Sequence, residues 1–538
     1  MSKNILKNKR SCVFILLFVL GTSVWLGGCD TAYKYDITDG IDNNGASEPD
    51  ITIDTEGGID VSMYEKARIF PGLVDTAKEE RINATIELDL NKQYIDSITL
   101  GVSKVPQPIY STGLYAGAGE QVAITVEDNT MGLSVIVGSH MDDLTELAPY
   151  QRMPLVYVAK ALFPGKNIIK NPLGGPIWIK KSLGLKASGT CSLKIEGVYK
   201  SPDFVIGETD LQDWKRRISE TTVPWLEIRG KHFAFTVQKD RVLDNLESIS
   251  STLQEVGKEW DEAIEEFFFE YYGLKIDKDA EEKERAPEFP FRVVLDVQVL
   301  GNLYLRNSDY AIVAINNTYM LEEMLNLRTL RIGNSVALLS AINSMCTYRS
   351  RNNPWPADYR AVANAIPLYR IGKKNFSKEN AFGEIFPGEE NITTLFPKAI
   401  EYAMADSSKW AKEDAATKYD DKTAYKAFDL LSLIQLANYD DNNWEAMKYL
   451  NLKAKEERSI DNSTLSYAFR MLCDYFKQNL CPFFDYWGVE QLDEDRKYAE
   501  QYPLMDKKIW EYNPLNPQQL KDYDVSSYCY RHSRRDWK

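Results

Sequence analysis

Arginine and aromatic side chains gather in one short stretch about two thirds of the way along this 538-residue sequence, at Tyr348, Arg349, Trp355, Tyr359 and Arg360. Aromatic faces stack against sugar rings, and a guanidinium group holds a carboxylate in a two-pronged ion pair. The stretch is therefore a candidate binding site for a glycan or a glycopeptide. Core packing between helices is the alternative for each aromatic residue, and the sequence alone leaves it open.

Two helices are expected to carry this stretch. An apolar stripe at steps of three and four residues predicts the first helix, at Ile332, Val336, Leu339, Ile342 and Met345. After a break, Pro356 suits the first position of a second helix, because its ring fixes a helical backbone angle and a missing N–H is tolerated there. Two helices joined by a tight connection would hold the aromatic and arginine side chains near one another.

Histidine is scarce, and the three histidines lie far apart: His140, His232 and His532. No helix of this chain can therefore present two histidines to a zinc ion. His140 lies near Asp142 and Asp143, where a polar binding site and a structural loop both remain open.

The first 28 residues are predicted to be an export signal. Basic residues through Arg10 precede an apolar run, Val13 to Leu20, that is too short for a stable membrane span. The run leads into Leu26-Gly27-Gly28-Cys29, which resembles the cleavage box of bacterial lipoproteins. We expect cleavage before Cys29 and acylation of its thiol, which would anchor the chain to the lipid bilayer of a bacterial outer membrane or cell surface. An ordinary secretory signal that ends near a chance cysteine is the alternative.

Residues 29–60 are predicted to be a flexible tether, because they are rich in Asp, Asn, Gly and Thr and lack apolar periodicity. The net charge of the chain is −15, and removal of the signal with Lys3, Lys7, Lys9 and Arg10 lowers it to −19. A chain this acidic repels phosphate backbones, which argues against nucleic acid as a partner.

Residues 61–237 are predicted to form an antiparallel β-sandwich-like domain. Five runs are predicted to be strands because apolar and polar residues alternate along them: ATIELDL, DSITLGV, EQVAITV, LSVIVGS and FAFTV. Turn sequences such as GAGE and NPLGGP separate them, as is typical of antiparallel sheets.

Residues 238–495 are predicted to be mainly helical, with one strand at Phe291–Val299, and residues 496–538 to be a C-terminal extension. A long apolar stripe runs from Leu243 to Phe267 and predicts an amphipathic helix. The acidic side chains Glu265, Glu266 and Glu270 would suit acid–base chemistry, and the solvent-exposed face of that helix is the alternative reading. The expected fold class is therefore α+β with several domains.

Five cysteines follow Cys29 in the expected mature chain: Cys191, Cys346, Cys473, Cys481 and Cys529. Their number is odd and their spacings match no zinc motif, so buried free thiols or a single disulfide are expected.

Several blocks of sequence, taken in order, resemble the enhancin and enhancin-like zinc metallopeptidases, a gluzincin-type family associated with mucins and other glycoproteins. The blocks are TGLYAGAGE (112–120), LSVIVGSH (133–140), NPLGGPIWI (171–179), PWLEI (224–228), DVQ (296–298), the segment 438–449 and NLCPFFDYWGV (479–489). The resemblance covers roughly residues 100 to 495. It implies a β-domain followed by a helical peptidase domain of the gluzincin type.

The resemblance fails where the family does its chemistry. In the family, a His-Glu-x-x-His helix supplies two zinc ligands and a general base, and a glutamate on the next helix supplies the third ligand. Alignment on this family places Leu338 and Ile342 at the two histidines, Leu339 at the catalytic glutamate and Arg360 at the third ligand. The segment 307–312 also lacks the His-x-Gly that often precedes its tyrosine in the family.

Leucine and isoleucine have no lone pairs for a metal, and a guanidinium repels a divalent cation. Zinc is the cofactor that the resemblance implies, but the ligand set is absent. We therefore expect no cofactor and no zinc-peptidase activity.

These observations lead to the hypothesis of a lipid-anchored surface protein with an inactive enhancin-like domain that binds mucin-type glycoproteins or glycans. One alternative is an active glycoprotein-directed metallopeptidase or hydrolase with an unrecognised site, using carboxylates such as Asp296 or Asp309. Another is a scaffold subunit of an outer-membrane uptake complex. The sequence does not choose among them.

Overall fold

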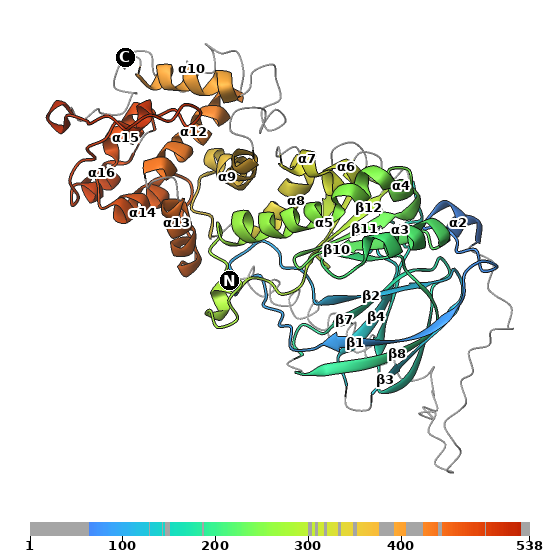
Figure 1. Cartoon of the computed structure of the whole chain (residues 1–538). Coiled ribbons are helices and arrows are strands. Elements are labelled where there is room, and N and C mark those ends of the chain that lie inside the picture. Colours follow the sequence, from blue (N-terminus) through green and yellow to red (C-terminus); the bar gives the residue numbers. More distant parts are fainter. Residues whose placement is uncertain are drawn as a thin grey trace, which may run out of the picture. The chain divides into compact units, whose positions relative to one another are not determined.

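The computed structural model describes residues 64–528, apart from 128–129, 143, 146–150, 186–187, 300–303, 307–309, 317–319, 332–334, 348–351, 376–391, 405–422, 440–443 and 490. The predicted fold class is confirmed, because an antiparallel β-rich part is followed by a largely helical part (Figure 1).

The first part is one strongly curved antiparallel sheet. Its strands are β1 (Ile82–Asp89), β2 (Ile109–Ala116), β3 (Gln121–Val126), β4 (Leu133–Val137), β5 (Val158–Leu162), β6 (Gly165–Lys170), β7 (Gly175–Lys181) and β8 (Thr190–Lys200). The order is β5-β4-β7-β2-β8-β3-β6, with β1 on β8. Lys160 Nζ on β5 donates to the carbonyl of Ile168 on β6 at 2.8 Å, so the two ends of the sheet approach each other and nearly close a barrel. Alternate residues such as Ile124, Val135 and Ile195 fill its interior, as the period of two predicts.

A second sheet has six strands in the order β13-β14-β12-β11-β10-β9. The strands are β9 (Phe204–Val205), β10 (Trp225–Arg229), β11 (Phe233–Gln238), β12 (Phe291–Asp296), β13 (Tyr304–Arg306) and β14 (Ile312–Asn316). The strand predicted from FAFTV is β11 and pairs with β10 and β12, not with the first sheet. The first sheet therefore ends at β8, before the boundary expected at residue 237, and the part expected to be helical contains three of the six strands of a mixed sheet.

One helix precedes both sheets, and the others interrupt or follow the second sheet. They are α2 (Tyr64–Ile69), α3 (Leu211–Glu220), α4 (Lys239–Leu243), α5 (Leu246–Glu262), α6 (Met320–Leu325), α7 (Leu327–Arg331), α8 (Val336–Cys346), α9 (Ala357–Asn375), α10 (Ile392–Met404), α12 (Thr423–Tyr439), α13 (Glu445–Glu456), α14 (Ser466–Phe476), α15 (Cys481–Tyr486) and α16 (Asp493–Ala499). Helix α5 continues into a π-helical segment, Ala263–Phe269. The predicted stripe is confirmed on α5, where Leu253, Val256 and Trp260 are buried.

The second sheet is the middle layer of three, because its residues alternate between two neighbours. Val293 and Leu295 on β12 belong to the same apolar cluster as Leu253 and Trp260 of α5. Val294, between them, packs with Trp178 and Ile136 of the first sheet. In Figure 1, α5 lies along one side of β10–β12 and the first sheet along the other. The first sheet therefore packs against the second sheet, and a cavity lies between them near the end of α5.

Residues expected to form a C-terminal extension join this fold up to residue 528. The ring of Trp510 is buried and stacks on Tyr486 of α15, with centroids 4.0 Å apart.

The four cysteines within the described residues, Cys191, Cys346, Cys473 and Cys481, are buried free thiols. No helix in the described part of the chain has both the length and the apolar character needed to cross a membrane.

Candidate functional site

Helices α8 and α9 correspond to the two helices that the sequence predicted around the aromatic stretch. Asn343 Nδ2 on α8 donates to the carbonyl of Asn364 on α9 at 2.6 Å, which fixes the two helices against each other. The amide of Leu338 in the first turn of α8 donates to Glu323 Oε2 at 3.0 Å. A carboxylate at this end complements the positive end of the helix dipole.

The positions aligned with the zinc motif lie inside an apolar core. Leu338, Leu339 and Ile342 are each 0% exposed and belong to the largest apolar cluster of the chain. Arg360 lies on α9 and is half-buried, and its Nε has no hydrogen-bond partner among the described residues. Three apolar side chains and a guanidinium are not a donor set for zinc, so the residues present do not fit the metal. No group of three or more His, Cys, Asp or Glu side chains within the described residues is arranged to hold a metal ion.

The predicted glycan-binding aromatics are not exposed in this structure. Trp355 is 2% and Tyr359 is 5% exposed, and their rings lie nearly parallel with centroids 6.2 Å apart. Their faces are covered by the core, which is the packing alternative considered for them. Tyr348 and Arg349 lie outside the described residues, as does Cys29. Glycan binding by Tyr348, Arg349, Trp355, Tyr359 and Arg360, and acylation of Cys29, stay predictions.

Asp296 is part of a buried ion pair. Arg152 Nε donates to both Asp296 oxygens at 2.9 and 3.1 Å, Arg152 Nη2 donates at 2.8 Å, and both side chains are 0% exposed. The backbone N–H of Gln298 also donates to Asp296, at 2.9 Å. A carboxylate held in this way connects the loop after β4 to the end of β12 and does not face solvent. Asp309, the other carboxylate considered for hydrolysis, lies outside the described residues.

His140 is structural in this arrangement. Its Nε2 lies 2.8 Å from the carbonyl oxygen of Leu295 and its Nδ1 lies 3.1 Å from Ser139 Oγ. Burial lowers the pKa of His140 to about 4. The neutral ring, with Nε2–H donating to Leu295, therefore holds the loop against β12, and Asp142 lies 3.9 Å from Arg152 in the same loop. Asp143 lies outside the described residues.

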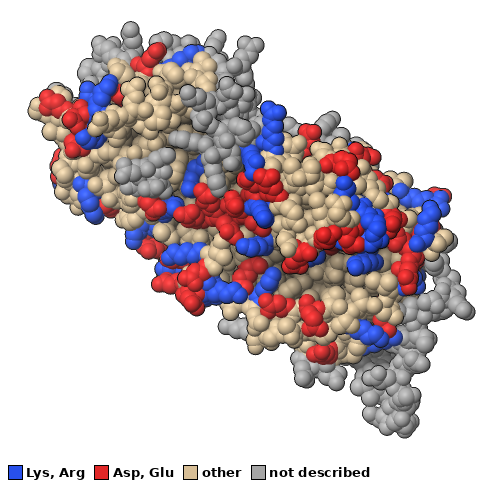
Figure 2. Space-filling model, in the orientation of Figure 1, with Lys and Arg blue, Asp and Glu red and all other residues tan. Residues whose placement is uncertain are grey.

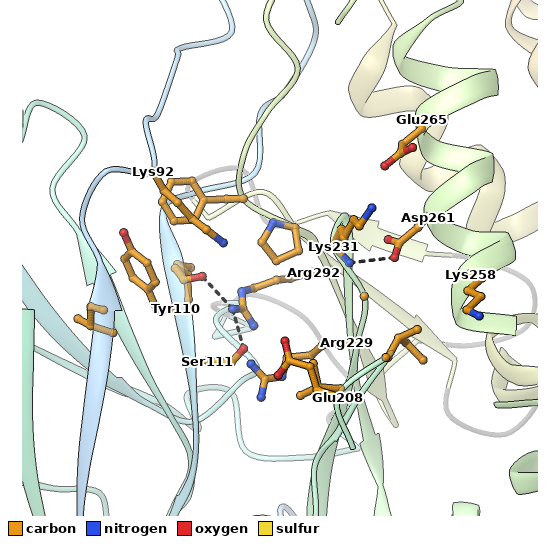
Figure 3. Close-up of a pocket in the computed structure, with 18 of the residues that line it drawn as sticks. Lys92, Tyr110, Ser111, Glu208, Arg229, Lys231, Lys258, Asp261, Glu265 and Arg292 are labelled. Atoms are coloured by element: carbon orange, nitrogen blue, oxygen red, sulfur yellow. Dashed lines mark hydrogen bonds between the residues drawn. The ribbon is translucent and has the colours of Figure 1, made fainter. Parts of the chain in front are cut away.

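A cavity of about 650 Å³ lies between the first sheet, the second sheet and the end of α5. Its lining includes none of the residues of α8 or α9. Strands β1 and β2 contribute Glu87, Tyr110 and Ser111, and the connection after β1 contributes Lys92. The second sheet contributes Arg229 and Arg292, and the helical side contributes Lys258, Asp261 and Glu265 (Figure 3).

Arg292 joins the two sheets at the bottom of this cavity. Its Nη1 donates to Glu227 Oε1 at 2.8 Å, and its Nη2 donates to the carbonyl of Ile109 and to Ser111 Oγ, both at 2.9 Å. Its guanidinium also lies over the ring of Trp178, 4.5 Å from the centroid. A buried arginine with this many partners serves to position the surrounding groups.

The acidic side chains on the helical wall are engaged by the protein itself. Asp261 accepts the backbone N–H groups of Lys231 and His232 at 3.0 and 2.9 Å, and burial raises its pKa. Glu265 Oε1 lies 2.7 Å from His232 Nε2. Of the other two acids predicted as a solvent face, Glu270 pairs with Lys448 and Glu266 is half-buried. Figure 2 shows acidic side chains gathered across the middle of one face, over α5 and the π-helical segment.

Sequence reasoning missed this cavity, although one signal was present. Arg292 is a charged residue inside the apolar strand FRVVLD, and buried charges are rare unless they are paired. Lys92, Arg229 and Lys231 have no motif that would connect them, because they come from separate turns.

Two adjacent families match the chain. Residues 80–195 match the N-terminal domain of M60-like peptidases, and residues 197–331 match peptidase M60, enhancin and enhancin-like. The second match ends just before α8.

Among curated proteins, human TRPM8 channel-associated factor 2 is 27% identical over 195 residues, which are 35% of this chain and 19% of that protein. Mouse TRPM8 channel-associated factor 3 is 24% identical over 424 residues, which are 75% of this chain and 40% of that protein. The chain therefore spans less than half the length of these relatives.

Solved structures share the fold. The ZmpB metallopeptidase from Clostridium perfringens has a TM-score of 0.61 at 17% identity, covering 81% of this chain and 83% of that one. The M60 catalytic domain of ZmpC from Clostridium perfringens, in complex with the sialyl T antigen, has a TM-score of 0.60 at 16% identity, covering 81% and 83%. A functionally unknown protein from Bacillus anthracis has a TM-score of 0.62 at 18% identity, covering 82% and 84%.

Proposed function

Residues 80–331 of this chain are the two consecutive domains of the M60, enhancin-like peptidases, and on that premise we propose a surface protein that binds glycoproteins without cleaving them. The proposal has three parts: a lost zinc site, a retained glycan partner and a lipid anchor at Cys29.

The observation that carries the first part is the filling of α8. Leu338, Leu339 and Ile342 are fully buried among apolar side chains, at the positions aligned with the zinc ligands and the general base. Hydrolysis by the zinc route needs ligands with lone pairs and a carboxylate that takes the proton of the attacking water. The side chains on α8 supply neither of them.

A glycan partner is supported by a structural neighbour. The M60 domain of ZmpC was solved with the sialyl T antigen, a sialylated glycan, and its fold is similar to that of this chain over 81% of the residues. A domain that loses its metal can keep the surface that held the substrate, since the two depend on different residues.

The anchor is supported by the Leu26-Gly27-Gly28-Cys29 sequence alone. Acyl chains on Cys29 would hold the protein on a membrane face, and residues 30–63 would connect the anchor to the first helix, α2.

The test uses the chain from residue 30 onward, purified in the presence of zinc. We expect no stoichiometric zinc by mass spectrometry, no cleavage of a mucin-type glycoprotein over a day and retention on immobilised mucin. A peptidase that cleaves the same glycoprotein serves as the positive control for cleavage. Cleavage that a chelator abolishes would overturn the inactive reading. Absence of retention on mucin would overturn the glycan-binding part and favour a scaffold role.

Acylation is tested separately in a bacterial host. The full-length chain should label with an alkyne fatty acid and fractionate with membranes, and the Cys29→Ser variant should do neither. Equal labelling of the two proteins would refute the anchor.

A further inference from the structure

The cavity between the two sheets differs from the rest of the molecule in the availability of its positive charges. The chain as a whole has a net charge of −15, whereas the cavity is lined by five basic and five acidic side chains. Which of these charges are already paired within the protein decides what the cavity attracts.

Its key carboxylates are occupied. Asp261 accepts two backbone N–H groups and Glu265 contacts His232, as described above. Glu227, directly behind the lining, is buried and accepts from Arg292 at 2.8 Å. Glu227 therefore neutralises Arg292, and none of these three carboxylates forms an ion pair with Lys92, Lys231 or Lys258.

Several cations are less engaged. Lys92, Lys231 and Lys258 form no ion pair with any described residue, and Lys92 Nζ has only the ring of Phe289, at 6.0 Å from its centroid. Arg229 lies 3.5 Å from Asp203 and 3.9 Å from Glu227, and its buried Nε has no hydrogen-bond partner in the described part of the chain. These distances exceed those of a charge-assisted hydrogen bond, which are about 2.7–2.9 Å.

Of the basic side chains, Lys92, Arg229 and Arg292 come together on one wall, whereas Lys258 lies on the helical side (Figure 3). In Figure 3, the ammonium group of Lys92 extends toward Arg292, and Arg229 lies below them beside Glu208. Arg292 is fixed by Glu227, Ile109 and Ser111, so this cation of the wall is preformed. Preformed cations reduce the ordering that a bound anion would require.

Polar and aromatic groups surround the same space. Glu208, an exposed residue of the lining, can accept hydrogen bonds from hydroxyl groups, and the rings of Tyr110 and Phe289 form an edge-to-face pair with centroids 5.3 Å apart. The Tyr110 hydroxyl donates to the carbonyl of Asp89 at 2.7 Å, which holds its ring in place. A cavity of about 650 Å³ is in the size range of small-ligand sites and accommodates sugar rings.

We propose that this cavity is a second binding site, separate from α8 and α9, for an anionic sugar. Lys92 and Arg229 hold the acidic group of the sugar beside Arg292, and Glu208 accepts hydrogen bonds from hydroxyl groups of the sugar ring. The acidic group is a carboxylate or a sulfate ester, both of which present oxygens to basic side chains. The inference rests on the proposed function in that it assigns the acidic sugars of a glycoprotein to a particular place.

The experiment measures binding of small probes by calorimetry to the chain from residue 30 onward. The probes are N-acetylneuraminic acid, galactose 6-sulfate and neutral galactose, at low salt. We expect one acidic probe to bind and galactose to bind at least about tenfold more weakly, since a hydrogen bond to a charged group contributes enough for a tenfold change. The stronger acidic probe identifies a carboxylate or a sulfate as the natural group.

Two variants locate the site. Lys92→Gln and Arg229→Gln should each weaken binding of that probe about tenfold or more, and Lys194→Gln, which removes a lysine exposed on β8, should leave it unchanged. Lys92 has no ion pair with any described residue, so its variant keeps the test valid if Arg229→Gln folds poorly. Equal affinity of the acidic probe for Lys92→Gln and the parent chain, or equal binding of galactose, would overturn the proposal.

Retention on immobilised mucin distinguishes this proposal from the function proposed above. Loss of retention in the parent chain would refute glycoprotein binding, whatever the calorimetry gives. Retention that survives in Lys92→Gln, together with unchanged probe affinity, would refute the cavity alone and leave glycoprotein binding in place.

Discussion

The buried pair of Arg152 and Asp296 allows a quantitative test of how the loop after β4 is held to the second sheet. Asp296→Asn keeps the shape of the side chain and removes its charge, leaving a guanidinium that is 0% exposed. Breaking such a buried pair costs about 3–5 kcal/mol. Arg152 retains its bond to the carbonyl of Met153 at 3.0 Å and a distant contact with Asp142 at 3.9 Å. We therefore expect a loss of about 3 kcal/mol in the free energy of unfolding.

The assay is denaturant unfolding at pH 7, followed by tryptophan fluorescence. Asp213→Asn is the control, because Asp213 forms exposed pairs with Arg216 and Arg217, and exposed pairs contribute at most about 1 kcal/mol. The double variant Arg152→Met/Asp296→Leu should lose less stability than Asp296→Asn, since it leaves no unpaired charge. A loss below about 1 kcal/mol for Asp296→Asn, or a double variant less stable than the single one, would refute this reasoning.

Three further outcomes are expected. Burial lowers the pKa of His140 from 6.5 to about 4, so at pH values between these two the unfolded chain binds a proton that the folded chain does not. Unfolding measured at pH 7 and pH 5 should therefore show the free energy of unfolding falling by about 1.4 kcal/mol per pH unit below 6.5. His140→Gln should flatten this dependence, and an unchanged slope would contradict the prediction. Burial lowers the pKa of Lys455 to about 7, and its Nζ has no hydrogen-bond partner among the described residues. Lys455→Met should therefore raise the thermal midpoint of unfolding at pH 7, whereas Lys453→Met, which changes a more exposed lysine, should leave it unchanged. A lower midpoint for Lys455→Met would show that the protein stabilises the ammonium group. Trp355→Ala should destabilise the chain by about 3–5 kcal/mol, because Trp355 is 2% exposed. A circular-dichroism melt that matches the parent would show that the ring does not stabilise the core and is available to a ligand.

Local pattern predicted the elements better than their partners. Alternation in ATIELDL and EQVAITV predicted β1 and β3, and the stripe from Leu243 to Phe267 predicted α5. The same alternation assigned β11 to the wrong sheet, because a period of two gives the faces of a strand but not its neighbours. Pairing is decided by contacts between distant segments, which one sequence does not display.

The candidate sites show the same contrast between what local sequence predicts and what depends on contacts between distant segments. The positions of α8 were predicted from order along the chain, and the structure shows them packed in the core. The cavity could not be predicted, since Lys92, Arg229 and Arg292 are far apart in sequence and meet only after the two sheets pack together. The aromatic stretch shows the remaining difficulty, because Trp355 and Tyr359 have the composition of a sugar site and the burial of core residues.

The apolar filling of α8 also has an evolutionary consequence. Histidine at positions 338 and 342 would place two imidazoles where the present side chains are 0% exposed, and each substitution would destabilise the fold before metal binding could offset the loss. A glutamate at position 339 would add a buried carboxylate to the same core. No single substitution on this route would create a zinc site, because one or two protein ligands hold zinc much more weakly than the full set. Under the proposed function, absence of the zinc ligands would therefore act as a ratchet, in which selection could refine binding by this domain but could not readily lead it to hydrolysis.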